Sequence, residues 1–328
     1  MGEFELIERF FKRPAQRARL AVGELGIGDD CALLNPTPGH QWVMSADMLV
    51  EERHFFSCTD PRHLGHKSLA VNLSDLAACG AQPRAFLLSL ALPEADEVWL
   101  SAFSQGLLAL ADAHGCALVG GDTTQGPLNI AITVVGEVPQ GQALRRSGAR
   151  AGDDIYVSGH LGQARLALEV LRGHLSLPDE VFTVCRARLE QPTPRVALGL
   201  ALRGIASAAV DLSDGLLGDL GHILQASRVG AQIDVALSET LLPCAAAIAG
   251  PHECLHTCVF AGGDDYELAF TAAASQREAV QQAAQRSQTQ VTRIGTVTAH
   301  TGVVLRDAHG QHLPATFASF DHFAPASS

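Results

Sequence analysis

Acidic residues in this sequence recur where short apolar runs meet glycine, serine or threonine, and Asp30, Asp47, Asp122, Asp211 and Asp214 all stand at such places. Strand ends can meet at one rim of a sheet, where converging carboxylates repel one another strongly. Such a group needs cations, and its hard oxygen ligands suit Mg²⁺ or Mn²⁺. Because Mg²⁺ usually shares its coordination shell with substrate phosphates, the pattern predicts a metal-dependent nucleotide site.

The alternative interpretation is that each acidic residue only caps a turn, because Asp, Ser and Gly are the residues that turns use. A single such turn would carry no information. Here the acidic turn recurs, and the chain has only two lysines, Lys12 and Lys67, that could pair with the carboxylates. On the pattern alone, a metal site is therefore favoured over unrelated turn caps by roughly three to one.

Asp75 lies in an apolar stretch that predicts a helix. Asp60 can cap its start, Pro61 suits its first position, and Gly80 suits a left-handed end. A carboxylate among Ala, Val, Leu and Cys is costly to bury without a partner. For an isolated Asp, a hydrogen bond or salt bridge to a neighbouring element would be the preferred interpretation. Beside the other acidic stretches, Asp75 is predicted to belong to the same cation site.

The chain has 328 residues, 47% of them hydrophobic, which is enough for two domains of ordinary size. Its net charge of −12 argues against a nucleic-acid or anionic-membrane surface. Mixed strands and helices predict an α/β or α+β architecture in two layered domains. A polar, Gly-rich stretch over 140–152, which contains Arg145 and Arg146, marks the boundary. The predicted domains are therefore 1–145 and 146–328.

The expected elements follow hydrophobic periodicity and turn residues. A hairpin is expected within 20–58, an acidic turn at 120–124, and a short amphipathic helix at the N-terminus. Strands are expected at 42–47, 86–93, 128–138, 155–158, 206–210, 231–237, 268–271, 291–297 and 303–307. Helices are expected at 96–114, 161–171, 195–203, 216–227 and 275–287.

Cysteine usage and hydropathy predict a cytoplasmic protein. The eight cysteines form no disulfide framework, no apolar stretch reaches membrane-spanning length, and the first residues lack a signal-peptide form. His252, Cys254, His256 and Cys258 alternate, but this spacing is poor for a tetrahedral zinc site. Structural zinc is weighed at about 10%, and an ordinary loop or strand is predicted there.

Five stretches of the sequence each contain an aspartate within a short motif. They are Gly26-Ile27-Gly28-Asp29-Asp30, Asn72-Leu73-Ser74-Asp75-Leu76-Ala77-Ala78, Gly120-Gly121-Asp122-Thr123-Thr124, Asp211-Leu212-Ser213-Asp214-Gly215-Leu216 and Gly262-Gly263-Asp264-Asp265-Tyr266-Glu267-Leu268. Together they resemble the bacterial thiamine-monophosphate kinase family, and their order and spacing agree over nearly the whole chain. The family belongs to the superfamily of aminoimidazole-ribonucleotide synthetase and selenophosphate synthetase. The resemblance implies an N-terminal α/β domain that binds metal and ATP and pairs its sheet in a homodimer, followed by a larger C-terminal α/β domain.

The resemblance also implies roles for individual residues. The implied Mg²⁺ positions are Asp30, Ser45, Ala46, Asp47, Asp75, Asp122, Asp211 and Asp214. Of these, Asp75, Asp122, Asp211 and Asp214 are expected to act in catalysis through the metal ions. The implied ATP contacts are Gly121, Asp122, Arg146 and Ser213, with Arg145 as a local competitor of Arg146. The implied thiamine phosphate contacts are His54, Asp264 and Phe320.

Three of these positions depart from the family pattern. Ala46 stands where relatives have Thr, so only its backbone carbonyl is left as a ligand. Asp264 replaces Glu, which shortens the carboxylate. Phe320 replaces Tyr or Trp, and relative to Tyr it keeps aromatic packing but loses the hydroxyl.

The implied reaction converts ATP and thiamine phosphate into ADP and thiamine diphosphate. The acceptor phosphate is largely dianionic near neutral pH, because its second pKa is about 6, so direct transfer needs neither a general base nor a covalent phospho-enzyme. One alternative is another ATP-dependent member of the superfamily. Selenophosphate synthetase would require a reactive Cys near the N-terminus, and residues 1–30 contain none. The other alternative is a non-enzymatic regulator that binds divalent cations and nucleotide without turnover.

Overall fold

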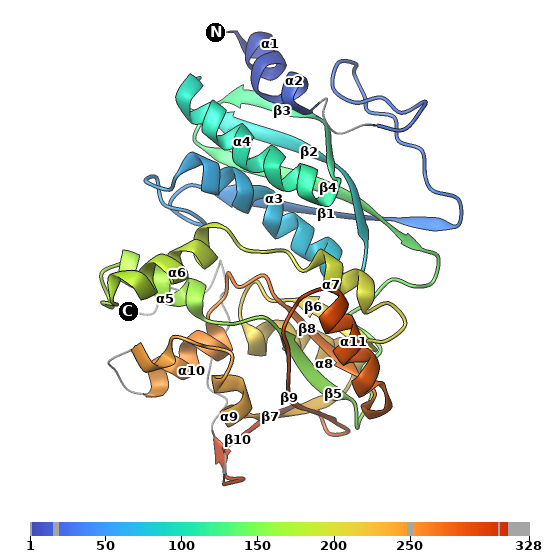
Figure 1. Ribbon diagram of the computed structural model, residues 1–328, viewed down its shortest axis with the longest axis vertical. Helices are drawn as coiled ribbons and strands as arrows, with labels where there is room; N and C mark the ends of the chain where they lie inside the picture. Colours follow the sequence, from blue (N-terminus) through green and yellow to red (C-terminus); the bar gives the residue numbers. More distant parts are fainter. Residues whose placement is uncertain (1, 16–19, 248–251, 308, 314–328) are drawn as a thin grey trace. The chain divides into compact units, whose positions relative to one another are not determined.

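The computed structural model describes residues 2–15, 20–247, 252–307 and 309–313 (Figure 1). It divides into two compact units. The N-terminal unit comprises Met1–Leu76 and Ala81–Ala143, and the C-terminal unit comprises Ala77–Gly80 and Leu144–Ser328. Each unit combines a β-sheet with helices, which confirms the predicted mixed α/β class. Phe320, a predicted substrate contact, lies outside the described residues.

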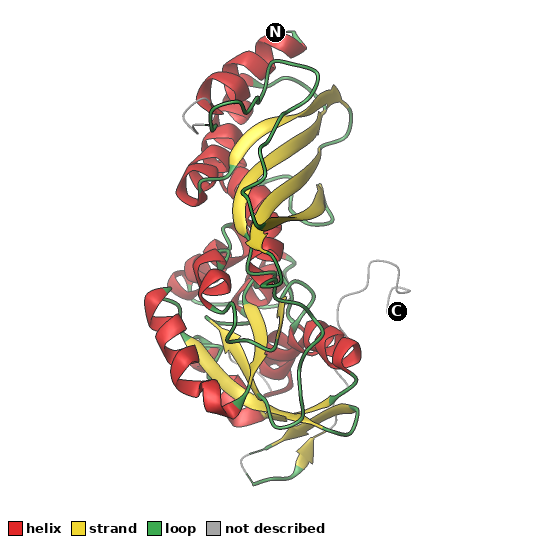
Figure 2. Cartoon of the chain, turned by 90° about the vertical axis from the view of Figure 1, so that its right-hand side faces the viewer, coloured by secondary structure: helices red, strands yellow, loops and turns green. Residues whose placement is uncertain are grey.

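The N-terminal unit is built on a four-stranded sheet in the order β1-β4-β2-β3. Its strands are β1 (His40–Val50), β2 (Gln82–Leu92), β3 (Ala117–Gln125) and β4 (Asn129–Pro139). β2 and β3 are parallel, whereas β4 is antiparallel to both of its neighbours. Helices α3 (Pro61–Ala78) and α4 (Glu97–His114) cover one face of this sheet (Figure 2).

Local signals set the ends of these two helices, as predicted. Asp60 Oδ1 accepts a hydrogen bond from the Arg62 N–H at 2.8 Å, and Gly80 follows α3 with a left-handed φ of 63°. Asp96 caps α4 through two backbone N–H groups, and Gly115 ends it with a φ of 60°. The leucines at helical spacing in α3 are at most 2% exposed, which shows that the periodicity identified the buried face.

Two predictions for this unit are wrong. Residues 20–39 do not form a hairpin but an irregular segment with an isolated bridge between Leu25 and Leu33. Leu20, Ala32 and Leu34 of this segment pack on Ala85, Ala117 and Val119 of the sheet. The acidic turn expected at 120–124 is instead a continuation of β3, because β2 pairs with it as far as Gln125. The N-terminal helix is present as α1 (Glu3–Leu6), η1 (Ile7–Lys12) and α2 (Arg13–Ala15).

The C-terminal unit contains a seven-stranded mixed sheet in the order β11-β10-β7-β9-β5-β8-β6. Its strands are β5 (Asp154–Ser158), β6 (Ala208–Asp211), β7 (Gly230–Asp234), β8 (Leu268–Ala272), β9 (Val291–Thr298), β10 (Gly302–Arg306) and β11 (His312–Leu313). Its helices are α5 (Gln163–Leu171), α6 (Asp179–Glu190), α7 (Val196–Ala201), α8 (Leu216–Ser227), α9 (Val235–Glu239), η2 (Ala245–Ala247), α10 (His252–Ala261), η3 (Ala274–Gln276) and α11 (Arg277–Arg286).

Strand β5, which lies between β9 and β8 inside the sheet, shows why helices lie on both faces of this sheet. Ile155 and Val157 belong to the large apolar core that α5, α6, α8 and α10 complete. Tyr156 points to the other side, where its ring stacks on Phe270 at 5.2 Å and lines a pocket together with Val280 of α11. Every residue of β5 is buried, as expected for a strand covered on both faces.

Two expectations for this unit need correction, and helix α6 was not predicted at all. The strand expected over 231–237 ends at Asp234, whose side chain caps α9 by accepting from the Leu237 N–H at 3.1 Å. The segment with alternating His and Cys is helix α10, not a loop or strand, and His256 pairs with Glu239 at 2.8 Å while Cys258 is buried. None of the helices in the described ranges is both long and apolar enough to cross a membrane.

Candidate active site

Strand β1 and helix α3 bring two predicted metal ligands of the N-terminal unit into contact. The Ser45 hydroxyl donates a hydrogen bond to Asp75 Oδ2. The same strand and helix are tied again where the Asp47 N–H donates to Asn72 Oδ1 at 3.2 Å. Asn72 is 1% exposed, and its Nδ2 donates to the Ser68 carbonyl at 3.0 Å, so its orientation is determined on both sides. Oxygen ligands from two elements are therefore held at one place.

Ala46 lies between these two residues on β1, opposite Thr133 of β4, and its side chain is exposed. A methyl side chain carries no donor atom. Any contribution of Ala46 to a cation is therefore limited to its backbone carbonyl, as predicted from the sequence.

His54 follows β1, and one of its ring nitrogens has a defined role. The Val50 N–H donates to His54 Nδ1 at 2.9 Å. Because Nδ1 accepts, the hydrogen bond assigns the neutral ring as the tautomer with its proton on Nε2. Nε2 is then a hydrogen-bond donor. The Lys67 ammonium donates to the His54 carbonyl at 3.4 Å, which links this turn to α3.

Asp122 does not join the group around Asp75 within this sheet. The register places Asp47 opposite Ile132, Ile132 opposite Leu88, and Leu88 opposite Gly121. β1 and β3 are thus the two outer strands, three strand spacings or about 14 Å apart. One cation cannot bridge that distance, so the sheet separates the predicted ligands into at least two groups.

Gly121 is required by the backbone beside Asp122. Its φ is 143°, and a Cβ at this position would lie 1.8 Å from the Leu88 carbonyl oxygen. Only glycine permits β3 to pass so close to β2. The family motif therefore has a packing reason at this position in addition to the predicted ATP contact.

Asp30 lies in the irregular segment 20–39, is exposed, and directs its backbone N–H to Asp29 Oδ1 at 2.8 Å. Arg84 of β2 holds this segment to the sheet. Its guanidinium pairs with Glu24 at 3.2 Å and with Glu137 at 3.3 Å. Asp30 is thus anchored through its segment, but the structure gives it no contact with Asp75 or Asp47.

In the C-terminal unit, two family motifs form one hydrogen-bonded pair. The Leu212 N–H donates to the Glu267 carbonyl, the Tyr266 N–H donates to the Leu212 carbonyl, and the Asp264 N–H donates to the Ser213 carbonyl, each at 2.8 Å. These bonds continue the antiparallel pairing of β6 with β8 beyond the strand ends. The predicted ATP contact Ser213 and the predicted substrate contact Asp264 are therefore neighbours.

Asp264 and Tyr266 both have left-handed backbones, with φ of 58° and 49°. Such conformations are uncommon for residues other than glycine and tend to occur at functional sites. Behind them, Glu267 forms a paired salt bridge with Arg195 and accepts from the Ser158 hydroxyl at 2.5 Å. The motif that carries the predicted substrate contact is therefore held by a buried ionic network.

The last residue of β6 and the turn that follows it carry the predicted ligands Asp211 and Asp214. Asp219, in the first turns of α8, is 3% exposed, and its Oδ2 accepts from the Asp214 N–H at 3.0 Å and the Gly215 N–H at 3.1 Å. Burial raises the pKa of the Asp219 carboxyl to about 7, with the Asp214 carboxylate adding to the rise against the backbone N–H groups. Cations would relieve this concentration of carboxylates.

Arg146 lies next to the same strand. The Arg145 carbonyl accepts from the Ala209 N–H of β6 at 2.9 Å, and the Arg146 carbonyl accepts from the Ser227 hydroxyl at 3.2 Å. Both arginine side chains are exposed, and the described residues show no ion pair for either. The backbone is thus positioned while the guanidinium groups are available to a phosphate.

Within the described ranges, no group of three or more His, Cys, Asp or Glu side chains is arranged to hold a metal ion by itself. The oxygen donors are nevertheless of the kind that Mg²⁺ prefers: carboxylates, a serine hydroxyl and a backbone carbonyl. Mg²⁺ commonly binds through one or two carboxylates, with waters and substrate phosphates completing its shell. The donor set therefore fits this cation in the presence of a nucleotide.

Comparison with known proteins identifies the family. Residues 28–138 match the N-terminal domain of AIR synthase related proteins, and residues 150–308 match their C-terminal domain. Thiamine-monophosphate kinase of Escherichia coli K12 is 44% identical over 98% of both chains, and that of Salmonella typhimurium LT2 is 45% identical with the same coverage. The chain belongs to the thiamine-monophosphate kinase family.

Solved structures of the thiamine-monophosphate kinase family agree with this fold. The enzyme from Stenotrophomonas maltophilia K279a has a TM-score of 0.82 at 46% identity, over 95% of this chain and 98% of that one. A complex of AaThiL with AMPPCP and TMP has a TM-score of 0.74 at 30% identity, over 98% and 97%. The hydrogenase maturation protein HypE, at 22% identity and a TM-score of 0.75, shares the fold.

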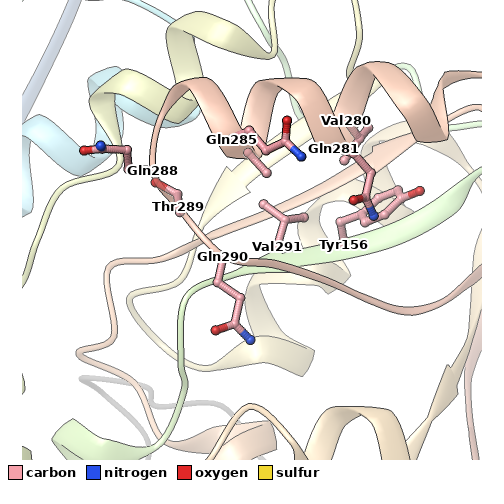
Figure 3. Close-up of a pocket in the computed structure, with 9 residues that line it drawn as sticks. Tyr156, Val280, Gln281, Gln285, Gln288, Thr289, Gln290 and Val291 are labelled. Carbon is pink, nitrogen blue, oxygen red and sulfur yellow. The ribbon is translucent and has the colours of Figure 1, made fainter.

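A separate pocket of about 330 Å³ lies between α11 and the start of β9 (Figure 3). Tyr156 and Val291 form part of its apolar lining, and exposed glutamines of α11 and the following turn surround it. None of the predicted family site residues lines this pocket.

The sequence interpretation missed two residues that organise the site, Asn72 and Asp219. A signal was present for each. Asn72 lies three positions before Asp75 and so shares its face of the helix. Asp219 lies in the first turns of α8, where a carboxylate can fold back on preceding N–H groups. The signal at Asn72 does not identify its partner, because the Asp47 N–H lies on another element.

Proposed function

We propose that this protein transfers the γ-phosphoryl group of ATP directly to the phosphate of thiamine phosphate, giving thiamine diphosphate and ADP. The observation that carries the proposal is the likeness to AaThiL in complex with AMPPCP and TMP, over nearly the full length of both chains. The hydrogen-bonded pair formed by the Ser213 and Asp264 motifs supports it, because these motifs carry predicted ATP and substrate contacts.

We further propose that Mg²⁺ ions bind during the reaction. The residues proposed to hold them are Asp30, Ser45, Asp47, Asp75, Asp122, Asp211 and Asp214, with the Ala46 carbonyl. When bound, Mg²⁺ supplies charge neutralisation between two polyanions and stabilises charge on the transferred group.

The protein's own groups bind and orient the substrates. His54, through its Nε2–H, is proposed to donate to thiamine phosphate. Arg146 is proposed to bind ATP phosphate through its exposed guanidinium, and Phe320 to pack on the substrate. No proton needs to be removed, since the acceptor oxygen is already anionic near neutral pH. The carboxylates therefore serve cations, and no general base is assigned.

We also propose that the protein forms a homodimer. The proposed interface is the face of the N-terminal sheet that α3 and α4 do not cover (Figure 2). Met44 and Met48 of β1 are 64% and 55% exposed, and Leu87 of β2 is 38% exposed. Apolar side chains this exposed on one sheet favour association with a second copy. Sedimentation of the purified protein at micromolar concentration is expected to give the mass of two chains.

A cytoplasmic location is also proposed. The eight cysteines of the sequence form no disulfide framework, which suits a reducing compartment.

The test is steady-state release of ADP with thiamine phosphate, free thiamine and other phosphomonoesters at saturating Mg²⁺-ATP. Thiamine phosphate is expected to turn over and free thiamine is not, because a free hydroxyl would have to lose its proton to a base. Comparable turnover with free thiamine would contradict direct transfer to a phosphate. Binding of ATP and Mg²⁺ without turnover on any acceptor would identify the protein as a regulator.

A further inference from the structure

The turn 212–215 is held on one side entirely by backbone bonds. The Glu267 carbonyl accepts from the Leu212 N–H, and the N–H groups of Asp264 and Tyr266 donate to the Ser213 and Leu212 carbonyls. These bonds fix where the turn lies, and they do not involve the N–H groups of the next two residues, Asp214 and Gly215.

Asp219 supplies those partners from the other side. A single oxygen, Oδ2, accepts from both the Asp214 and the Gly215 N–H groups. The carboxylate is almost completely buried, so water does not compete for these bonds. The turn is also confined sterically, since a Cβ on Gly215 would lie 2.7 Å from the Ala261 Cα. Asp219 and the close approach of Ala261 therefore both restrict the backbone of this turn.

The direction of a side chain follows from the φ and ψ of its own residue. Asp219 binds the N–H of Asp214 itself, and the adjacent peptide groups belong to Ser213 and Gly215. We propose that Asp219 is a positioning residue, which aims the Asp214 carboxylate and the Ser213 hydroxyl at the cation and nucleotide without binding either. The inference rests on the proposed function, because it assigns those two side chains to the kinase site.

The experiment compares Asp219→Ala with Asp219→Asn. The amide oxygen of Asn can occupy the place of Oδ2 and accept both N–H groups, whereas Ala offers no acceptor. Asp96→Ala is the matched control, because Asp96 also accepts from two backbone N–H groups, those of Val98 and Trp99, but at the start of α4. If Asp219→Ala does not fold, Asp219→Glu replaces it, since the longer side chain displaces the oxygens.

Three readouts are taken. The first is Mn²⁺ binding to the protein in the presence of AMPPCP, followed by electron paramagnetic resonance. The second is hydrogen–deuterium exchange of the peptide that spans 211–216, followed by mass spectrometry. The third is activity as a function of Mg²⁺ concentration. Asp219→Ala is expected to weaken Mn²⁺ binding about tenfold or more, to speed exchange in 211–216, and to raise the Mg²⁺ concentration for half-maximal activity by a similar factor. Asp219→Asn is expected to stay within about threefold of the wild type in Mn²⁺ binding. Asp96→Ala is expected to lower thermal stability only.

Two results would overturn the inference. Unchanged Mn²⁺ binding and exchange in Asp219→Ala would show that Asp219 only stabilises the fold. Equal losses in Asp219→Ala and Asp219→Asn would show that its charge, not its hydrogen bonding, is what matters. If the wild type makes no thiamine diphosphate, the proposed function fails, while the Mn²⁺ and exchange measurements still decide the role of Asp219.

Discussion

At the scale of single residues, the most informative contact is the hydrogen bond from Ser45 to Asp75. It joins a strand residue to a helix residue thirty positions later. The Ser45 hydroxyl is neutral, so this hydrogen bond orients the Asp75 carboxylate without neutralising its charge.

Asp75→Asn is therefore expected to fold and to lose nearly all turnover. The amide can still accept from Ser45, but it removes a negative charge that the proposed cations require. Removing that charge relieves repulsion among carboxylates in the metal-free protein, so the melting temperature is expected to hold or rise. Turnover per folded molecule and the melting temperature are measured together.

The matched control is Asp112→Asn, which changes an exposed helical carboxylate of the same unit. It is expected to leave both quantities unchanged. If Asp75→Asn instead unfolds the protein while the folded fraction keeps its activity, Asp75 is structural.

At the scale of elements, the parallel pair β2–β3 depends on a close approach at Gly121. Its positive φ and its contact with the Leu88 carbonyl both exclude a side chain. Asp122 comes next on the strand, so the packing requirement and the predicted ligand are adjacent. A change at Gly121 thus affects the sheet before it affects chemistry.

Comparing Gly121→Ala with Gly115→Ala separates the cost of backbone strain at positive φ from the cost of a steric clash. Both positions have positive φ, but a Cβ at Gly115 meets no atom within 4 Å. Gly115→Ala is expected to cost about 1 kcal/mol of stability, from backbone strain alone. Gly121→Ala is expected to cost about 3 kcal/mol, because strand pairing must also shift.

Urea unfolding followed by tryptophan fluorescence measures both variants. The two tryptophans, Trp42 and Trp99, both lie in the N-terminal unit, so the signal reports that unit. Equal losses of unfolding free energy in the two variants would mean that β2 moves away from the added methyl group without a measurable cost.

At the scale of the whole molecule, the pH dependence of stability depends on buried carboxylates. Asp154 of β5 is 1% exposed and accepts from Arg277 Nε at 2.6 Å and from Arg293 Nη1 at 2.9 Å. The Arg277 hydrogen bond is the main cause that lowers the pKa of Asp154, and Arg293 adds to it against the effect of burial. One carboxylate thus joins β5, α11 and β9.

Because the pKa of Asp154 is lower in the folded than in the unfolded state, its ionic contacts contribute full stability above the unfolded value of about 3.9. That contribution is lost as the pH falls through the folded pKa. Asp154→Asn is expected to cost about 1–3 kcal/mol at pH 7, a modest figure because both arginines are partly exposed. The gap in unfolding free energy between Asp154→Asn and the wild type is expected to narrow below about pH 4.

Calorimetric melting between pH 7 and pH 3.5 measures this gap. Asp179→Asn, an exposed carboxylate of the same unit, is the control and is expected to shift the melting temperature little at any pH. A gap that stays constant down to pH 3.5 would contradict the assignment to ionised Asp154.

The sequence by itself determined those helices whose start, end and buried face depend on residues within or next to the helix. α3, α4 and α8 were predicted nearly to the residue, because capping side chains, glycines and helical periodicity lie within the elements themselves. The acidic motifs were also visible in the sequence, since each is a contiguous run of a few residues.

Only the tertiary structure decided which of these motifs meet. It paired Ser45 with Asp75 and Ser213 with the Asp264 segment, and it placed Asp122 on the opposite edge of the sheet from Asp47. It also turned the acidic turn expected at 120–124 into strand. In place of the hairpin expected within 20–58, it formed an irregular segment at 20–39 anchored by Arg84 and a strand, β1, that pairs with β4. The physical reason is the same in each case: strand pairing and buried polar contacts depend on partners far away in the chain, and no local pattern of residues specifies them.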